Sequence, residues 1–430
     1  MTHRHLLTGH VLHFAGDPFA GPWQDAVQID TDGAVLIADG RIVATGAAAR
    51  VTGDDITHHD HSGRLICPGF IDAHAHYPQT AIIASWGKRL IDWLNTYTFP
   101  EEMRLADPAY ARKTADTYLD LVLDHGTTSV ASYCTIHPHS VTALFEAAET
   151  RGMAIVAGKT CMDRNAPDGL RDTAQSAYDD SKALLDHWHG TGRARYAITP
   201  RFSPTSTPDQ LAALGALWSE RPDALMQTHL SEQIDEIDWV RGLFPQARDY
   251  LDTYEQFGLL GARGLYGHAI HLTPREIDRL RDTGGALVHC PTSNTFIGSG
   301  LFDLMGLAGG GIPVGLATDT GGGSSFSMLR TMAAAYEIAQ LRGVAVHAAQ
   351  LLWLATAGSA RALHRQDHIG TLAPGMDADI CVLDLASTPA IAQRVDQART
   401  IWDAVFPTLM MGDDRAVADV WVAGRQRMRP

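Results

Sequence analysis

Short apolar runs alternate with amphipathic segments through the middle of the chain. Eight runs of five to eight residues combine apolar and β-branched side chains, a composition typical of buried strands. These runs are residues 65–72, 128–134, 154–161, 195–202, 224–230, 264–270, 286–290 and 313–319. Between them, segments such as 141–152 and 273–284 repeat apolar residues every three or four positions, the period of a helix. Strands and helices in strict alternation predict an α/β fold, a (β/α)₈ TIM-like barrel over residues 67–369.

The two ends of the chain show a different pattern. HLLTGHVLHF (5–14) and GAVLIADGRIVATG (33–46) are short strand-like runs punctuated by glycine and aspartate, and so are ADICVLDL (378–385) and ADVWVAGRQR (418–427). We predict one small β-sandwich domain formed by residues 1–66 and 370–430, with the barrel inserted between its halves. Two unrelated strand-rich tails are the alternative that the pattern leaves open.

Composition and charge narrow the classes of partner. The chain has 430 residues, of which 45% are hydrophobic, so it is long enough for a large core. Its 34 basic and 49 acidic residues give a net charge of −15, which disfavours nucleic acid and anionic membranes. We expect no membrane span, because no apolar run is long enough for one. The first residues, MTHRHLLTGHVLHFAG, have no long apolar core and make a poor signal peptide. A small neutral molecule remains compatible with this surface.

The cysteines favour a reducing compartment. Five cysteines are spread along the chain without a CxxC pair, so a disulfide framework is not expected. We therefore predict a cytoplasmic protein.

Five residues follow or end separate apolar runs and together suggest one metal site. They are His74, His76, His229, His268 and Asp319. Residues two apart on a strand point to the same side, so His74 and His76 can face one ion. The carboxyl ends of barrel strands meet at one face, where active sites of this fold lie. Imidazole nitrogens with a carboxylate suit zinc, or iron as a second choice.

Other candidate ligands have simpler interpretations. HPH at 137–139 is expected in a loop, and His271 at the start of the next loop or helix. We place His58, His59 and His61 in a solvated turn, and we leave open whether His289 lines the site. Lys159 lies on the third predicted strand, whereas the lysine that bridges two metals in some hydrolases comes from the fourth. The position of Lys159 therefore favours one metal.

Glu232 is the candidate proton shuttle. It lies three residues after His229, where it can lean over a metal-bound water without ligating the ion. Its alternative role is a carboxylate favoured by a helix N-terminus. Asp319 could both ligate and accept a proton, and His268 could ligate or orient water and substrate from outside the ligand shell.

Long runs of unusual composition extend these observations into a resemblance. They include PGFIDAHAH (68–76), HYPQ (76–79), CMDRNAPDGLRDT (161–173), ITPRFSPTS (198–206), HLSE (229–232), CPTSN (290–294), GSGLFDL (298–304) and TDTGGGSSFSMLRTM (318–332). The chain resembles the amidohydrolase superfamily, in its mononuclear metal-dependent aminohydrolase branch, and within it the guanine deaminases. The resemblance runs over most of the chain. Gly169 departs from the bulkier residue we associate with this family, which puts the fit of its loop in doubt.

The resemblance implies an activity and a set of roles. The implied activity is hydrolytic deamination of guanine to xanthine and ammonia, with one zinc ion (Zn²⁺) per chain and Fe²⁺ as the alternative. Metal binding is carried onto His74, His76, His229 and Asp319, and catalysis onto Glu232, His268 and Asp319. Contact with the purine base is carried onto His76, Gln79, Arg201, Phe202, His229, Glu232 and Asp319. A homodimer is also implied.

Three alternatives stay open or are excluded by the motifs. A related deaminase acting on 8-oxoguanine or another heterocycle could use the same ligands. A non-catalytic scaffold would be expected to lose metal-site residues, and all of them are present here. The unrelated zinc deaminases that use HxE with PCxxC are excluded, because the chain lacks that arrangement.

Overall fold

The computed structural model describes residues 4–51, 55–87 and 89–427. Contacts divide the chain into two compact units, which we describe separately. One, the terminal unit, comprises Met1–Asp72, Asp120–Ser129 and Phe326–Pro430; the other, the barrel unit, comprises Ala73–Leu119 and Val130–Ser325. The domain limits drawn from the sequence, at residues 66/67 and 369/370, stay a prediction.

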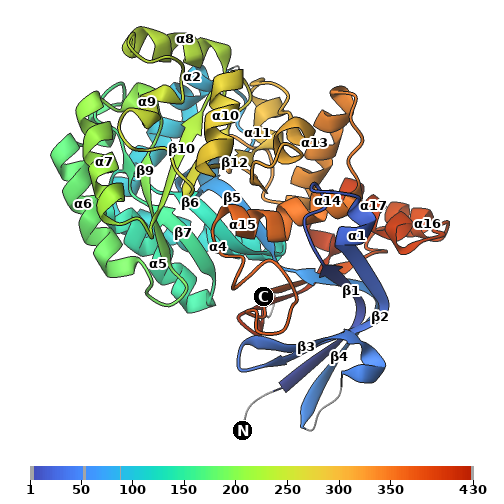
Figure 1. Ribbon diagram of the computed structural model, residues 1–430. Helices are drawn as coiled ribbons and strands as arrows, with labels where there is room; N and C mark the ends of the chain where they lie inside the picture. The colour runs from blue at the N-terminus through green and yellow to red at the C-terminus, as the bar shows by residue number, and fades with distance from the viewer. Residues whose placement is uncertain (1–3, 52–54, 88, 428–430) are drawn as a thin grey trace. The chain divides into compact units, whose positions relative to one another are not determined.

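Both ends of the chain join one seven-stranded sheet in the terminal unit, which confirms that a β domain combines them (Figure 1). Its strand order is β16-β15-β14-β4-β1-β2-β3. The strands are β1 Arg4–Phe14, β2 Val27–Ala38, β3 Arg41–Ala47, β4 Ile56–Pro68, β14 Ile380–Asp384, β15 Val417–Val422 and β16 Arg425–Gln426. All neighbours are antiparallel except β1 and β4. Asp39 and Gly40, both with positive φ, form the two-residue turn between β2 and β3.

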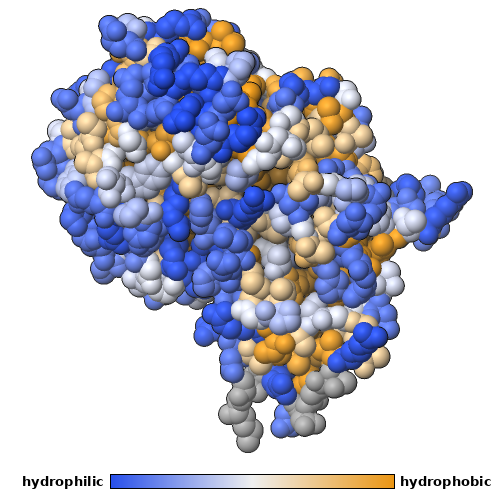
Figure 2. All heavy atoms as spheres, viewed as in Figure 1, coloured by the Kyte–Doolittle hydropathy of each residue, from blue (hydrophilic) through white to orange (hydrophobic). Residues whose placement is uncertain are grey.

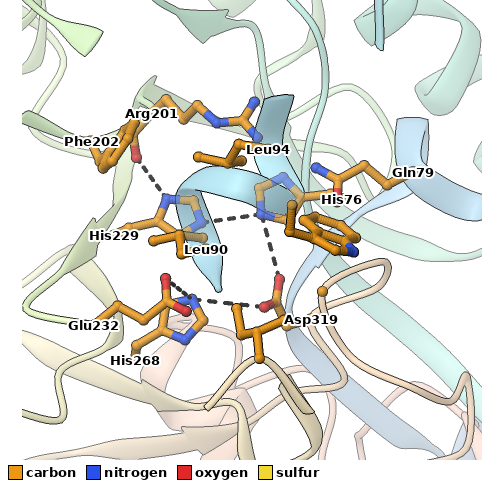
Figure 3. Close-up of a pocket in the computed structure, with 13 residues that line it drawn as sticks. His76, Gln79, Leu90, Leu94, Arg201, Phe202, His229, Glu232, His268 and Asp319 are labelled. Carbon is orange, nitrogen blue, oxygen red and sulfur yellow. Dashed lines mark hydrogen bonds and ion pairs between the residues drawn. The ribbon is translucent and has the colours of Figure 1, made fainter. Parts of the chain in front are cut away.

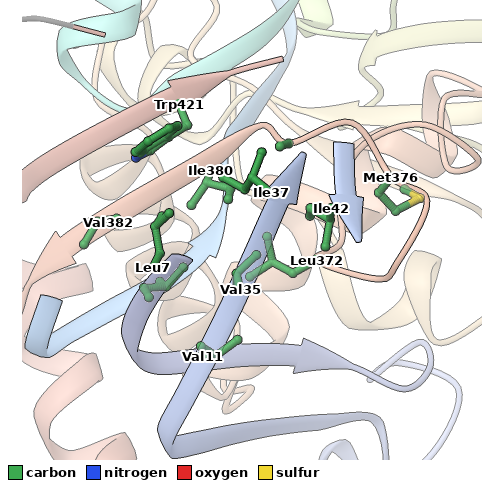
Figure 4. Close-up of a cluster of buried hydrophobic side chains, with 12 residues drawn as sticks. Leu7, Val11, Val35, Ile37, Ile42, Leu372, Met376, Ile380, Val382 and Trp421 are labelled. Atoms are coloured by element: carbon green, nitrogen blue, oxygen red, sulfur yellow. The ribbon is translucent and has the colours of Figure 1, made fainter. Parts of the chain in front are cut away.

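One apolar cluster holds this sheet together (Figure 4). Side chains from β1, β2 and β14 meet Leu372 and Met376, which precede β14 in the chain. Alternate residues of the strands point into the cluster, and on the opposite face Leu6, Ala34 and Leu36 form a second apolar cluster with Val51. The members of the cluster are Leu7, Val11, Val35, Ile37, Ile42, Ile66, Leu372, Met376, Ala378, Ile380, Val382 and Trp421.

The solvated turn predicted for His58, His59 and His61 is wrong, because all three lie within β4. Pairing with β1 continues through this polar stretch, with Leu6 opposite His58 and Leu7 opposite His59. Backbone hydrogen bonds to β1 therefore extend the strand through this polar stretch, although its side chains do not have the apolar pattern of a strand. His61 is buried, and the His59 ring packs edge-on against Trp421.

The eight-stranded parallel barrel predicted from the alternating pattern is confirmed. Its strand order is β13-β12-β11-β10-β9-β7-β6-β5, with the short β8 beside β9. The strands are β5 Phe70–His76, β6 Thr127–Tyr133, β7 Ala154–Gly158, β8 Thr160–Cys161, β9 Arg195–Pro200, β10 Leu225–Leu230, β11 Gly264–His268, β12 Ala286–His289 and β13 Val314–Leu316. Backbone hydrogen bonds from Asp319 N to His74 O (3.0 Å) and from His76 N to Thr320 O (2.5 Å) link the two ends of this order.

The first barrel strand starts later than the sequence predicts. The apolar run at 65–72 is divided at Gly69: its first part ends β4 and its second begins β5. A Cβ at Gly69 would lie 2.2 Å from Thr128 Oγ1, so only glycine fits at this crossing. His74 and His76 therefore lie within β5, near its carboxyl end, rather than beyond the strand.

Helices follow the strands and end where the sequence signals it. Figure 1 shows α5, α6 and α7 outside the strands they follow. The barrel-unit helices are α2 Leu90–Trp93, α3 Phe99–Met103, α5 Pro138–Arg151, α6 Ala174–Trp188, α7 Pro208–Glu220, α8 Ile234–Leu243, α9 Asp252–Glu255, α10 Pro274–Thr283, α11 Pro291–Phe296 and α12 Leu304–Ala308, and α4 Pro108–Asp124 begins in this unit. A threonine cap precedes proline at the start of α7 and α10, and left-handed Gly152 and Gly284 end α5 and α10.

Helices of the terminal unit come mostly from the last hundred residues. They are α1 Trp23–Ala26, α13 Met328–Leu341, α14 Ala348–Trp353, α15 Ser359–Ala362, α16 Pro389–Val395 and α17 Ile401–Met411. Most of the surface visible in Figure 2 is hydrophilic, with smaller hydrophobic patches among it. Within the described residues, the helices are too short or too polar for any of them to cross a membrane.

Candidate active site

The predicted site residues gather at the carboxyl ends of the barrel strands, all within the barrel unit. His74 and His76 end β5, His229 lies in β10, His268 ends β11, and Asp319 follows β13. His268 and Asp319 have φ angles of 65° and 50°, a left-handed conformation that non-glycine residues seldom adopt. Such backbone conformations concentrate at functional sites, because the surrounding structure must hold them.

Ligand atoms of several strand-end residues lie close together, and Figure 3 shows His76, His229 and Asp319 among them. His76 Nε2 lies 3.1 Å from His229 Nε2. Asp319 Oδ1 lies 3.5 Å from His74 Nε2 and 3.5 Å from His76 Nε2. Two sets of three groups each bring their ligand atoms within 4.8 Å of one another, His74 with His76 and Asp319, and His74 with His229 and His268.

The protonation of this cluster suits a bound cation. His229 Nδ1 donates to the Arg201 carbonyl oxygen at 2.7 Å, which leaves the lone pair of His229 on Nε2. Burial and the neighbouring His74 lower the pKa of His76 and of His229 well below the ordinary value, so both rings are neutral. Burial opposes ionisation of Asp319, but a hydrogen bond from His74 and the charge of His268 outweigh it and lower its pKa to about 2.

This donor set fits a divalent metal ion. Imidazole nitrogens together with one carboxylate are ligands that zinc takes in catalytic sites. Without a cation, two buried imidazole nitrogens 3.1 Å apart would have to share one proton. The structure thus brings His74, His76, His229 and Asp319 together, and their role as ligands stays a prediction.

Glu232 lies beside this cluster in a buried environment. It follows β10, and its Oε2 lies 3.6 Å from His268 Nε2. Burial, together with the nearby Glu236 and Asp319, raises the pKa of Glu232 to about 7, although His268 and Ser299 oppose this shift. A carboxyl group with this pKa can both hold and release a proton near neutral pH.

His268 faces two carboxylates. Its Nδ1 donates to Asn294 Oδ1 at 2.9 Å, so its Nε2 points towards Glu232 and towards Asp319 Oδ2, 3.8 Å away. Burial lowers the pKa of His268, but the charges of Glu232 and Asp319 outweigh that effect and raise it. This ring can therefore present a proton on Nε2 between the two carboxylates.

A pocket opens beside the cluster, and the space between its side chains, open solvent included, is about 430 Å³. Figure 3 shows Arg201 and Gln79 on one side of the imidazoles and Glu232 and His268 on the other. Apolar side chains complete the wall. The lining residues are His76, Gln79, Leu90, Trp93, Leu94, Arg201, Phe202, His229, Glu232, His268, Ile297, Asp319 and Gly322.

Comparison with known proteins identifies the family. The amidohydrolase family matches residues 65–427. A guanine deaminase of Escherichia coli (strain K12) is 43% identical over 403 residues, which cover 93% of this chain and 92% of that protein. The chain belongs to the amidohydrolase family.

Solved structures agree over the full length of this amidohydrolase. An E. coli guanine deaminase matches with a TM-score of 0.95 and 41% identity, over 99% of each chain. A guanine deaminase from C. acetobutylicum with guanine bound in its active site matches with a TM-score of 0.89 and 26% identity, over 99% of this chain and 100% of that one.

Three supporting residues of the amidohydrolase site were missed by the sequence reasoning. Ser299 Oγ donates to Glu232 Oε1 at 2.8 Å, Asn294 orients His268, and buried Glu102 binds both Arg201 and Gln79. Ser299 and Asn294 lie in the GSG and CPTSN runs quoted for the resemblance, so those motifs could have indicated them. Glu102 in FPEEM carried no such signal.

The remaining candidates lie outside the pocket lining. The loop predicted for HPH at 137–139 is wrong for Pro138 and His139, which begin α5. His139 donates to the Leu105 carbonyl oxygen, and His289 stacks on Phe302. Lys159 follows the third strand of the barrel order, and its Nζ lies 2.5 Å from Asp172 Oδ2. A Cβ at Gly169 would lie 3.4 Å from Met103 Sδ, so a side chain could be accommodated there.

Proposed function

We propose that this amidohydrolase deaminates guanine hydrolytically to xanthine and ammonia, with one zinc ion per chain. The observation that carries the proposal is a single pocket with a metal-type donor cluster, a buried carboxyl group of neutral pKa and a wall of hydrogen-bond donors. The resemblance of this chain to proteins named guanine deaminase, one of them with guanine bound, supports the choice of base.

The metal ligands in this proposal are His74, His76, His229 and Asp319. Zinc, when bound, acts as a Lewis acid that makes a water proton easier to remove at neutral pH. Asp319 then accepts a proton from the attacking water, because its carboxylate stays ionised throughout the physiological range. His268, fixed by Asn294, orients the water or the reacting carbon from the opposite side.

Glu232 moves the second proton. Water adds to C2 of guanine, and Glu232 gives a proton to the adjacent ring nitrogen. Asp319 then passes the proton it took from water to the exocyclic amine, the bond between C2 and that amine breaks, and ammonia leaves. Glu232 takes back the proton of the C2 hydroxyl, which leaves the carbonyl of xanthine. The pKa of about 7 suits this task, since a shuttle must both give up and take back its proton.

The donor wall recognises the base. Guanine has acceptors at O6 and N7, and Arg201 and Gln79 supply N–H donors on one side of the pocket. Phe202, at the end of the same loop as Arg201, offers an aromatic face on which a flat ring can stack. His76 and His229 complete the contacts expected around the reacting edge.

A turnover assay tests the proposal. Zinc-loaded protein is incubated separately with guanine, 8-oxoguanine, adenine, cytosine and adenosylhomocysteine, and ammonia and the product base are measured. We expect ammonia and xanthine from guanine at the highest rate. If 8-oxoguanine or another heterocycle is turned over faster than guanine, that compound is the substrate instead. If the metal-loaded protein turns over none of these bases, the proposal is contradicted.

Metal analysis and hydrodynamics test the accompanying predictions. We expect one zinc per chain after purification without added metal, and one iron per chain would favour the alternative cofactor. The homodimer predicts twice the chain mass in sedimentation equilibrium. The five cysteines are buried and stand outside disulfides, which supports the predicted reducing, cytoplasmic compartment.

A further inference from the structure

Glu102 joins the two polar residues of the pocket wall. Its side chain, from α3, is completely buried. Arg201 Nη1 donates to both of its oxygens, at 3.0 and 2.8 Å, and Gln79 Nε2 donates to Oε1 at 2.8 Å. One carboxylate therefore holds side chains that come from two other segments of the barrel unit.

These contacts determine which donors are left for a ligand. The side-chain hydrogen bonds that Arg201 makes within the described residues both run from Nη1 to Glu102. The Gln79 amide is fixed at both ends, because its Oε1 accepts from Gly321 N at 3.4 Å. One hydrogen on Gln79 Nε2 and the free face of the guanidinium therefore remain for substrate acceptors.

We propose that Glu102 is a positioning residue that orients Arg201 and Gln79 and also balances the charge of Arg201, so that the pocket prefers a neutral purine to an anionic one. This inference rests on the proposed function. It extends that function by naming the determinant of selectivity between the neutral substrate and the anionic form of the product.

Charge balance matters because the wall is buried. An unpaired guanidinium in a site of low effective dielectric constant would attract anions strongly. Xanthine loses a ring proton more readily than guanine, so a growing fraction of the product is anionic as pH rises. With Glu102 present the wall is neutral overall, and the anionic product gains little from Arg201.

Two variants separate orientation from charge. Glu102→Gln keeps the shape and removes the charge, whereas Glu102→Asp keeps the charge and withdraws the carboxylate by one methylene. Glu276→Gln is the matched control, because Glu276 is also a buried carboxylate but accepts from the backbone of Leu251 and Thr273, outside the pocket lining. The KM and kcat for guanine and the Ki for xanthine are measured at about pH 6 and about pH 8.5, and the melting temperature of each variant is recorded.

We expect Glu102→Gln to raise the KM for guanine about tenfold, with a smaller change in kcat. The reason is that Arg201 and Gln79 lose the charged acceptor that orients them. In the same variant the Ki for xanthine at about pH 8.5 should fall at least about threefold relative to the guanine KM, because the charge of Arg201 is no longer offset. Glu102→Asp should raise the KM and keep the wild-type ratio of Ki to KM. Comparison with wild type at equal pH cancels the titration of Glu232, which both proteins share.

The outcomes distinguish the two proposals. Glu102→Gln could have a lowered melting temperature while its guanine KM and its ratio of xanthine Ki to guanine KM match those of Glu276→Gln. That result would show a structural role for Glu102 and overturn this inference alone. Wild-type protein that releases no ammonia from guanine would overturn the proposed function together with this inference. If Glu102→Gln does not fold, Glu102→Asp decides between the two roles. In that variant, a ratio of xanthine Ki to guanine KM that changes by the same factor as the KM would contradict charge balance.

Discussion

Replacing Lys159 with methionine should destabilise the protein strongly without removing its metal. The Lys159 ammonium is 1% exposed, and its partner Asp172 is 6% exposed. Asp172 also accepts from Met162 N at 3.2 Å and from Gln210 Nε2 at 2.7 Å. The pair thus fixes the loop after β8, whose Met162 and Leu170 pack with Phe202 in one apolar cluster.

The size of the effect follows from what the substitution leaves behind. Burial lowers the pKa of Lys159, but Cys161 and Asp172 outweigh it and raise the pKa. Burial raises the pKa of Asp172 against the opposing effect of Lys159. We take the pair as ionised, because three donors surround Asp172. Removing one partner of a buried pair costs about 3–5 kcal/mol, which corresponds to a melting temperature lower by about 10 °C for a unit of this size.

Differential scanning calorimetry of Lys159→Met, Asp172→Asn and the double variant measures this coupling. The double variant should recover about half of the loss or more, because no uncompensated charge remains and the asparagine oxygen still accepts a hydrogen bond. Lys182→Met, at an exposed pair with Asp186, is the control and should leave the melting temperature nearly unchanged. Strictly additive losses, or zinc content lower in Lys159→Met than in wild type, would refute the assignment of Lys159 to the loop rather than to the metal.

Three further predictions concern the proton shuttle, the aromatic wall and acid stability. Glu232→Gln should lower kcat about 10²–10⁴-fold and keep the zinc content and melting temperature; an active variant would remove Glu232 from the shuttle role. Phe202→Ala should raise the KM for guanine about tenfold with less effect on kcat, and steady-state kinetics with an unchanged KM would exclude stacking. Burial raises the pKa of Asp252, but hydrogen bonds from Arg248 and Gln256 lower it to about 2. The resulting stability, about 1–2 kcal/mol, is present above about pH 4 and lost as pH falls through about 2, so Asp252→Asn should lower the melting temperature at pH 7 but not near pH 2.

The barrel could be predicted because its signals are local. Each strand is a short apolar run, and the helix ends carry their own caps, such as Thr273 before Pro274 and Gly284 after Thr283. The division of one apolar run at Gly69 could not be predicted in this way. It depends on the close approach of Thr128, nearly sixty residues away, and only the folded chain brings the two together.

The metal-type cluster was also accessible from the sequence, because strand ends of a parallel barrel share one face. Position in the chain is then enough to bring His74, His229 and Asp319 together. The histidines of β4 illustrate the limit of the method: His59 and His61 have the same two-residue spacing as His74 and His76, but they lie in the sheet of the terminal unit. Spacing alone does not distinguish the two pairs, and the order of the strands does.

The donor wall of Gln79 and Arg201, with Glu102 behind it, is assembled in a different way from the metal-type cluster. The cluster residues follow from the barrel itself, whereas Glu102, Gln79 and Arg201 meet only because a short helix, a 3-10 turn and a loop pack together. The motifs quoted for the resemblance placed Gln79 and Arg201 at one base, whereas nothing in the sequence indicated that Glu102 joins them. The same reasoning indicates which substitutions can change the substrate range without moving the residues assigned to catalysis. Under the proposed function, substitution of Glu102 should change the donors that Arg201 and Gln79 present to a base, while the residues at the strand ends keep their positions.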